Sequence, residues 1–270
     1  MCWLFCYIFI DFVREAENYI NKANLGHEYL TQNGIAEFNV CAQKLLFGDN
    51  HKLLTEKKVR FSSHNPVCLR QIHWFGCLFD IQVFSIQAVA GTGALLLAFQ
   101  FLAEVADSSG TSCAKTLVYY PSTTWGNHPA MIKGCGLEGK TYRYLDSTGC
   151  NLDFSGFCED LRGMEDNSVV LFHMCGHNPT GNYLCSVYNI IYTIWTLPNY
   201  ILILHVVGVD PTDEQWHEIY DIMTQKKILI LFDNAYQGFI SGDPDRDAYP
   251  IRYMTEQNAL HNRQMNIMAC

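Results

Sequence analysis

The stretch "KILILFDNAY", residues 227–236, decides the fold class of this chain. Residues 228–232 form an unbroken apolar run, and Asp233 ends it. A short apolar run without alternation indicates a strand that is buried on both faces, as in a parallel sheet covered by helices. A carboxylate at the end of such a strand needs a partner, because burying an unpaired charge is costly. Taken alone, an aspartate here is more often a helix cap or a loop residue.

The rest of the chain alternates predicted strands with predicted helices. The pattern predicts strands at 85–90, 115–121, 140–146 and 168–176, and helices at 94–106, at 153–161 and after Thr212. Thr212 and Gln215 have the spacing of a capping box. An apolar stripe follows them at helical spacing: Trp216, Ile219, Tyr220 and Met223. This alternation predicts an α/β fold with a mostly parallel sheet flanked by helices, whose ligands bind beyond the carboxyl ends of the strands.

Composition excludes several classes of protein. The chain has 270 residues, 49% of them hydrophobic, which is enough for a sizeable core. Its formal net charge of -9 argues against a nucleic-acid surface, which needs a basic patch. The twelve cysteines are scattered without metal-like spacing, so we expect reduced thiols and no metal site. The apolar N-terminus is a weak signal peptide and too short to span a bilayer.

A few polar and aromatic residues stand where predicted strands end. Gly91 and Thr92 open a predicted helix, whose free N–H groups and dipole favour a phosphate. Trp125 and Asn178 each follow a strand, so a ring and an amide are expected to face the pocket at Asp233. Each feature alone has an ordinary structural explanation, such as a packing glycine, a core tryptophan or an Asn-Pro turn. Their combination is what indicates a site.

Several stretches together resemble the aspartate aminotransferases, the fold-type I enzymes that use pyridoxal 5'-phosphate. The stretches are "HEYL", "AGTGAL", "YYPSTTWGNHP", "KTYRYLD", "HNPTG", "VDPTDEQW" and "FDNAYQGFISGDPDRDA", which occur in the family's order. The resemblance covers roughly residues 12–58, 83–181 and 209–252. It implies the large cofactor-binding domain of that fold, here incomplete.

The resemblance assigns roles to individual residues. Gly91 and Thr92 would hold the cofactor phosphate, although the family usually has serine where this chain has Ala90. Trp125 would stack on the pyridine ring. Asp233 would pair with the protonated ring nitrogen and keep the ring an electron sink for the carbanion formed when the amino acid loses its α-proton.

The remaining implied residues surround these. Asn178 and Tyr236 would both reach the phenolic oxygen of the cofactor. His128 would hydrogen-bond the aspartate. His128 and His173 would both support the cofactor-binding residues without touching the cofactor themselves. Tyr29 would reach the phosphate of the neighbouring subunit, so a homodimer is expected.

The implied activity is that of a transaminase. It is the reversible exchange of an amino group between L-aspartate and 2-oxoglutarate, which gives oxaloacetate and L-glutamate. The partners expected are therefore amino acids and 2-oxo acids, with no nucleic acid and no membrane. We expect a cytoplasmic protein, with mitochondria and plastids as the other compartments in which the family occurs.

The chain departs from the family in one decisive respect. Fold-type I chemistry depends on a Schiff-base lysine, which follows the "FDNAYQGF" stretch in the family. The last lysine of this chain is Lys227. The carboxylate-binding arginines that lie farther along are missing as well. We therefore assign no catalytic residue, expect at best noncovalent cofactor binding, and interpret the chain as truncated.

Two insertions interrupt the resemblance, at 59–82 and at 182–208. The codons at both ends of each insertion are compatible with GT and AG, and removing the insertions restores the family's wording. Our hypothesis is that both are translated introns or errors of gene prediction. The second run carries no Asp, Glu, Lys or Arg, so a membrane span and a functional lid are the alternatives. Pro198 and the position between a strand and its helix argue against a span.

The sequence thus predicts a partial N-terminal segment at 1–28, a partial cofactor-binding domain at 29–252 and an aberrant tail at 253–270. Two function classes stay open. The first is an aspartate transaminase by family, impaired by the missing lysine. The second is an inactive remnant that binds the cofactor or dimerises at most. An incomplete sheet leaves apolar faces exposed, so we expect low solubility.

Overall fold

A computed structural model describes residues 11–26, 28–55, 85–108, 116–180, 208–260 and 267–269. The chain divides into two compact units, residues 1–32 and 33–270. The first unit carries helix α1 (Asp11–Ala23). The expected insertion 59–82 lies outside the described residues, and so does 182–208 apart from Gly208.

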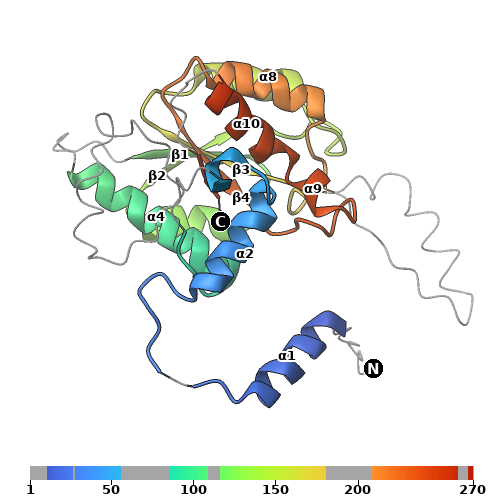
Figure 1. The fold of residues 1–270 in the computed structure, drawn as a ribbon. Helices are drawn as coiled ribbons and strands as arrows, with labels where there is room; N and C mark the ends of the chain where they lie inside the picture. Colours follow the sequence, from blue (N-terminus) through green and yellow to red (C-terminus); the bar gives the residue numbers. More distant parts are fainter. Residues whose placement is uncertain are drawn as a thin grey trace, which may run out of the picture. The chain divides into compact units, whose positions relative to one another are not determined.

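The second unit is built on a parallel sheet. Its strands are β1 (Leu117–Pro121), β2 (Glu138–Tyr142), β3 (Val169–His173), β4 (Leu229–Asp233) and β5 (Ile267–Ala269). Their order across the sheet is β2-β1-β3-β4-β5, and every neighbouring pair is parallel (Figure 1). The predicted α/β class with a parallel sheet is confirmed. Because all these strands run the same way, their carboxyl ends meet at one edge.

Helices cover both faces of this sheet. They are α2 (Ala36–Phe47), α3 (Lys52–Thr55), α4 (Ala90–Ser108), α5 (Asn127–Gly134), α6 (Phe154–Gly163), α8 (Asp213–Met223), α9 (Pro244–Asp247) and α10 (Tyr249–Leu260). Residues from α4 and α5 form the core on one face, and residues from α6, α8 and α10 form the core on the other. The segment expected to be an aberrant tail, residues 253–270, contains most of α10 and the whole of β5.

Alternation along β3 and β4 explains how one strand serves both cores. Leu171 and Leu231 belong to the core under α4 and α5, whereas Phe172 and Phe232 belong to the core under α6 and α8. Successive side chains of a strand point to opposite faces, so a doubly covered strand is apolar at every position. This burial on both faces explains the unbroken apolar run before Asp233.

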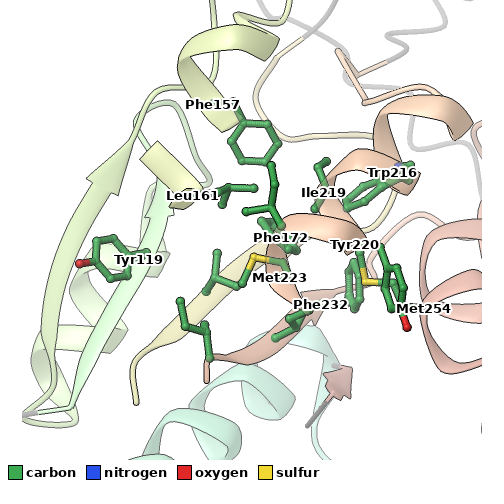
Figure 2. Packing of buried hydrophobic residues seen from close by; sticks show 14 of the residues in the cluster. Tyr119, Phe157, Leu161, Phe172, Trp216, Ile219, Tyr220, Met223, Phe232 and Met254 are labelled. Carbon is green, nitrogen blue, oxygen red and sulfur yellow. The ribbon is translucent and has the colours of Figure 1, made fainter. Parts of the chain in front are cut away.

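The larger core is centred on Phe172 (Figure 2). The Phe172 ring lies 5.7 Å from the Trp216 ring of α8, 6.0 Å from the Phe157 ring of α6 and 5.9 Å from the Phe232 ring, between centroids. Aromatic pairs at these separations add about 0.5–1.5 kcal/mol each to the burial of their area. This cluster fixes β3 and β4 against the helices, and with them the strand ends.

Two sequence expectations about strands need correction. The predicted strand 85–90 is wrong, because this stretch pairs with no strand of the described residues and α4 already begins at Ala90. Gln87 instead donates its N–H to the Asn33 carbonyl at 2.9 Å, and its side chain accepts the Ile35 N–H at 2.8 Å. The strand predicted at 140–146 lies at Glu138–Tyr142 instead (β2), and its first four residues are exposed at the sheet edge.

The described cysteines depart in part from the expectation of reduced thiols. Cys41, Cys135, Cys158 and Cys175 are free, but Cys150 is disulfide-bonded. Among the helices that the structure describes, none is long and apolar enough to cross a membrane.

The predicted capping box of α8 is confirmed. Thr212 Oγ1 accepts the Gln215 N–H at 3.3 Å, and Gln215 Oε1 accepts the Thr212 N–H at 2.9 Å. We expect Thr212→Ala to lower the free energy of unfolding by about 1 kcal/mol, because it leaves an end N–H of the helix without its partner. Urea unfolding of the full chain measures this. Thr212→Ser keeps the hydroxyl and should recover most of the loss, and equal stability of both variants would contradict the role of the cap.

Candidate active site

The carboxyl ends of β1, β3 and β4 bring a group of polar side chains together. Asp233 ends β4, and its register partner on β3 is His173. The loop after β1 leads through Thr124 and Trp125 into α5, which carries the fully buried His128. The predicted site residues Trp125, His128, His173 and Asp233 therefore meet at one sheet edge.

His128 contacts the aspartate. His128 Nε2 lies 3.2 Å from Asp233 Oδ2, with side-chain exposures of 0% and 11%. The contact is electrostatic, since Nε2 is buried and makes no well-directed hydrogen bond. His173 Nδ1 lies farther away, 4.0 Å from the same carboxylate oxygen. His128 and Asp233 are therefore neighbours, and the hydrogen bond predicted between them stays a prediction.

Thr124 links the two histidines behind the aspartate. Its Oγ1 lies 2.8 Å from His128 Nδ1 and 2.9 Å from His173 Nε2. A hydroxyl has one proton, so it cannot donate to both rings, and at least one ring must donate to it. The tautomers of His128 and His173 are therefore coupled through one oxygen atom.

Burial keeps the neighbouring imidazoles neutral. Desolvation lowers the pKa of His173 from 6.5 to about 3, and the nearby His177 and His128 lower it further, whereas Asp233 acts in the raising direction. Desolvation, followed by His128, also lowers the pKa of His177 to about 3. At neutral pH these two rings therefore act as hydrogen-bonding groups without charge.

Asn178 and Tyr236 meet beside this group. Asn178 Nδ2 donates to the Tyr236 hydroxyl at 3.4 Å, and the Asn178 N–H points at His173 Nδ1 at 3.5 Å. Tyr236 is 38% exposed, so its hydroxyl remains accessible to a ligand. The structure thus places an amide and a phenol side by side.

Trp125 forms a wall of the same region. Its half-buried ring lies 5.3 Å from the His128 ring in an edge-on arrangement with an interplanar angle of 82°. It also packs against the core under α4 and α5. A ring held on one side by a buried histidine offers its remaining surface to a planar ligand.

Gly91 and Thr92 lie in the first turn of α4 and are exposed. The first N–H groups of a helix lack partners within the helix, so this turn suits an anion. Thr92 shares a shallow hollow of about 380 Å³ with Asn127 and Ala130 of α5, the helix that carries His128. Tyr29, by contrast, belongs to the N-terminal unit, residues 1–32.

Sequence reasoning missed His177, Thr180 and Asp210, which hold the loop after β3. Asp210 accepts the Gly176 N–H at 2.7 Å and the His177 N–H at 2.8 Å. Thr180 Oγ1 accepts the Val209 N–H at 3.1 Å, which joins described residues on the two sides of the 182–208 insertion. Asp210 lies 34 and 33 residues from the two N–H groups that it accepts, so no local pattern marked it. Thr124 in the loop after β1 was missed as well, and its contact with His173 spans 49 residues.

The hydroxyl of Thr124 should contribute measurably to stability. We expect Thr124→Val to lower the free energy of unfolding by about 2 kcal/mol, because it leaves nitrogens of two buried rings without a partner. Thr124→Ser retains the hydroxyl and is the matched control. Chemical denaturation of both variants measures the difference. A Val variant as stable as the Ser variant would mean that the bridge adds nothing.

The donor set of this edge fits pyridoxal 5'-phosphate. A carboxylate with a buried imidazole behind it suits a protonated pyridine nitrogen, since it offers charge with little competing water. The amide and phenol of Asn178 and Tyr236 suit a phenolic oxygen, the helix start suits a phosphate, and the Trp125 ring suits a flat heterocycle.

Comparison with known proteins gives the same answer. The family model for aminotransferase class I and II matches residues 73–185 and 205–267. The mitochondrial aspartate aminotransferase of Dictyostelium discoideum is 32% identical over 253 residues, which cover 94% of this chain and 45% of that protein. The chain thus spans about half the length of this curated relative.

Solved structures of similar proteins share the fold. The cytoplasmic aspartate aminotransferase of Saccharomyces cerevisiae matches with a TM-score of 0.66 and 30% identity, over 91% of this chain and 46% of that chain. The aromatic-amino-acid aminotransferase of Burkholderia pseudomallei, covalently bound to pyridoxal phosphate, matches with a TM-score of 0.69 and 26% identity, over 95% of this chain and 48% of that chain.

Proposed function

The chain belongs to the class I and II aminotransferases, and from this premise we propose that it binds pyridoxal 5'-phosphate as part of an aspartate transaminase. The reaction proposed is the reversible transfer of an amino group between L-aspartate and 2-oxoglutarate, giving oxaloacetate and L-glutamate. The observation that carries the proposal is the convergence of Trp125, His128 and Asp233 at one sheet edge, with Asn178 and Tyr236 beside them.

Each of these residues has a proposed task. Asp233 would hold the protonated ring nitrogen, and Trp125 would cover one face of the ring. Asn178 and Tyr236 would donate to the phenolic oxygen, while Gly91 and Thr92 would bind the phosphate at the start of α4. When bound, the cofactor supplies a conjugated ring that accepts the electrons released as the amino acid loses its α-proton.

The histidines support the charge on Asp233. His128 lies directly behind the carboxylate, and Thr124 ties its far nitrogen to His173. This arrangement orients the aspartate and excludes water from its rear side, which strengthens its interaction with a cationic ring nitrogen. His128 and His173 are therefore positioning residues in this proposal.

Lys226 and Lys227 stand before β4. Lys227 lies two residues before the first residue of the strand, so it is at the opposite end of the strand from Asp233. Lys226 donates its Nζ to the Met164 carbonyl at 3.0 Å, and no lysine follows Lys227 in the sequence. The second candidate function is a catalytically inactive relative that binds the cofactor or dimerises without turning over substrate.

A homodimer is part of the proposed function. Tyr29 would complete the phosphate site of a neighbouring subunit, as the family resemblance implies. Size-exclusion chromatography with light scattering tests the dimer, and Tyr29→Phe should then weaken phosphate-dependent binding without changing the oligomer.

Two measurements on the full chain test the proposal. Pyridoxamine 5'-phosphate is the better probe of binding, because it lacks the aldehyde that reacts with any surface lysine. Saturable binding supports the site, and absence of binding overturns it. Oxaloacetate formation from L-aspartate and 2-oxoglutarate then separates the candidates: turnover supports the transaminase, and binding without turnover supports the inactive relative.

A further inference from the structure

Two aspartates to which the sequence assigned no role hold the loops that carry Asn178 and Tyr236. The first is Asp210, in the segment that leads into α8. Its carboxylate accepts the N–H groups of Gly176 and His177 at 2.7 and 2.8 Å, and Asn178 is the next residue of the same loop. Hydrogen bonds from N–H groups to a carboxylate are charge-assisted and therefore stronger than those between neutral groups. The backbone just before Asn178 is thus fixed by Asp210.

The loop after β4 is held in the same way by Asp247, the last residue of α9. This aspartate is 5% exposed, and it accepts the Gly238 N–H at 2.8 Å and the Ile240 and Ser241 N–H groups at 3.1 Å. Gly238 has a φ of +86°, a conformation that favours glycine. The carboxylate thus fixes the backbone that begins two residues after Tyr236.

The two loops pack against each other at Gly176. A Cβ atom on Gly176 would lie 2.6 Å from Ile240 Cδ1 and 3.2 Å from Tyr236 Cβ, so even a methyl group there would displace the Ile240 side chain. The φ of Gly176 is +62°, which also favours glycine. Each loop therefore has its own carboxylate and touches the other loop, and between them Asn178 Nδ2 donates to the Tyr236 hydroxyl at 3.4 Å.

Backbone N–H groups stabilise the charge of both aspartates. Neither carboxylate takes part in an ion pair of the described residues. Burial raises the pKa of Asp210, the N–H groups of His177 and Gly176 lower it, and the charge of Asp247 raises it again. The two carboxylates therefore repel each other, and the N–H groups that they accept offset this repulsion. An amide in place of either carboxylate would leave at least one N–H facing an NH₂ group.

We propose that Asp210 and Asp247 are positioning residues, which together hold Asn178 and Tyr236 in place for the phenolic oxygen of the cofactor. This inference rests on the proposed function, because it takes Asn178 and Tyr236 as the groups that contact that oxygen. The aspartates act through the backbone of the two loops and do not touch the cofactor. Because hydrogen bonds weaken steeply when their geometry is lost, a small shift of either loop should weaken the contact of both groups with the oxygen.

The ligand test compares pyridoxamine 5'-phosphate with its analogue in which hydrogen replaces the phenolic hydroxyl. Equilibrium dialysis of the full chain measures both affinities. We expect Asp210→Asn and Asp247→Asn each to weaken binding of pyridoxamine 5'-phosphate about fivefold, the order expected when a hydrogen bond is misplaced, and to leave the affinity for the analogue unchanged. A purely structural loss would weaken the binding of both ligands alike.

Asp146→Asn is the matched control. Asp146 also accepts backbone N–H groups of its own loop, those of Thr148, Cys150 and Asn151, but this loop carries no assigned site residue. The variant should bind both ligands like the parent chain. Selective loss of affinity in this control as well would overturn the proposal.

A second measurement needs no ligand. The ¹³C resonance of the ring carbon that bears the Tyr236 hydroxyl, assigned by its absence from Tyr236→Phe, reports the hydrogen bond from Asn178. Asn178→Ala gives the position of this resonance without the bond. We expect Asp210→Asn and Asp247→Asn to move the resonance toward that position, and Asp146→Asn to leave it in place.

The outcomes are separable. Selective loss of affinity together with the shifted resonance supports the proposal, whereas equal loss for both ligands or an unshifted resonance overturns it. Circular dichroism shows whether each variant is folded, and the two loops are tested independently. Unfolding of both variants would give the carboxylates a structural role alone and overturn the proposal. If neither ligand binds the parent chain, the proposed function fails, and the Tyr236 resonance alone decides whether the aspartates position the pair.

Discussion

Lowering the pH from about 7.5 to about 5 is expected to lower the free energy of unfolding by about 4 kcal/mol. Burial lowers the pKa of His173 and of His177 from 6.5 to about 3 in the folded chain. Once unfolded, both rings take up a proton near their ordinary pKa, whereas the folded chain does not. The unfolded state therefore binds more protons in this range, and stability falls as the pH falls.

The window and its limits follow from the same values. Well above pH 6.5 both states hold neutral rings, and well below pH 3 both states hold protonated rings, so the two histidines change stability mainly between these values. Each ring contributes about 2 kcal/mol by pH 5. Burial raises the pKa of Asp210, which works in the opposite direction as the solution becomes acidic. That carboxyl moderates the loss only toward the lower end of the range.

Urea unfolding at fixed pH steps measures the effect. His177→Gln replaces a titrating ring by an amide, so it should remove about half of the pH-dependent loss, whatever it does to stability at neutral pH. The exposed His217→Gln is the matched control and should keep the slope of the parent chain. A flat profile between pH 7.5 and 5, or an undiminished slope in His177→Gln, would show that the buried rings do not resist protonation.

The sequence predicted the central strands well, because burial on both faces requires apolar residues at successive positions. β3 and β4 are covered on both faces, so each is an apolar run with clear ends. β2 lies at the sheet edge, where four exposed residues leave no burial pattern, and its predicted bounds were shifted. The run at 85–90 has strand composition, but a strand also needs a hydrogen-bonded neighbour, which no local pattern reveals.

In the site, too, the sequence revealed residues with a local signal and missed a residue that is defined by its contacts in the folded chain. Asp233 stood out because a carboxylate after an apolar run is a local anomaly. Gly91, Thr92, Trp125 and Asn178 were marked by their positions near the ends of predicted strands, whereas the remaining residues came from the family resemblance. The structure brings Trp125, His128 and His173 to the aspartate. Thr124 was missed, because a loop hydroxyl has no periodic signature and its two ring partners are four and 49 residues away.

Asp233→Asn is expected to weaken the binding of pyridoxamine 5'-phosphate by about two orders of magnitude. In the proposed site the carboxylate makes a charge-assisted hydrogen bond to the protonated ring nitrogen, and such bonds contribute about 1.5–3 kcal/mol. An amide has nearly the same shape but no charge. It can also turn its NH₂ group toward the ring, where a protonated nitrogen offers no lone pair.

The surroundings of Asp233 make this loss larger than at an exposed aspartate. Its side chain is 11% exposed, and the buried His128 lies 3.2 Å behind it, so little water replaces the lost charge. The phosphate contacts proposed for Gly91 and Thr92 and the ring contact proposed for Trp125 do not involve the carboxylate. Binding should therefore weaken strongly without disappearing.

Equilibrium dialysis with pyridoxamine 5'-phosphate measures both affinities without reaction at surface lysines. Asp221→Asn, on the exposed side of α8, changes the net charge by the same amount and should leave the affinity unchanged. Equal weakening in both variants would indicate a general electrostatic effect of the acidic chain. An Asp233→Asn variant with the parent affinity would mean that the ring nitrogen is bound elsewhere, because no solvent-shielded carboxylate at a strand end should be replaceable without cost to its cationic partner.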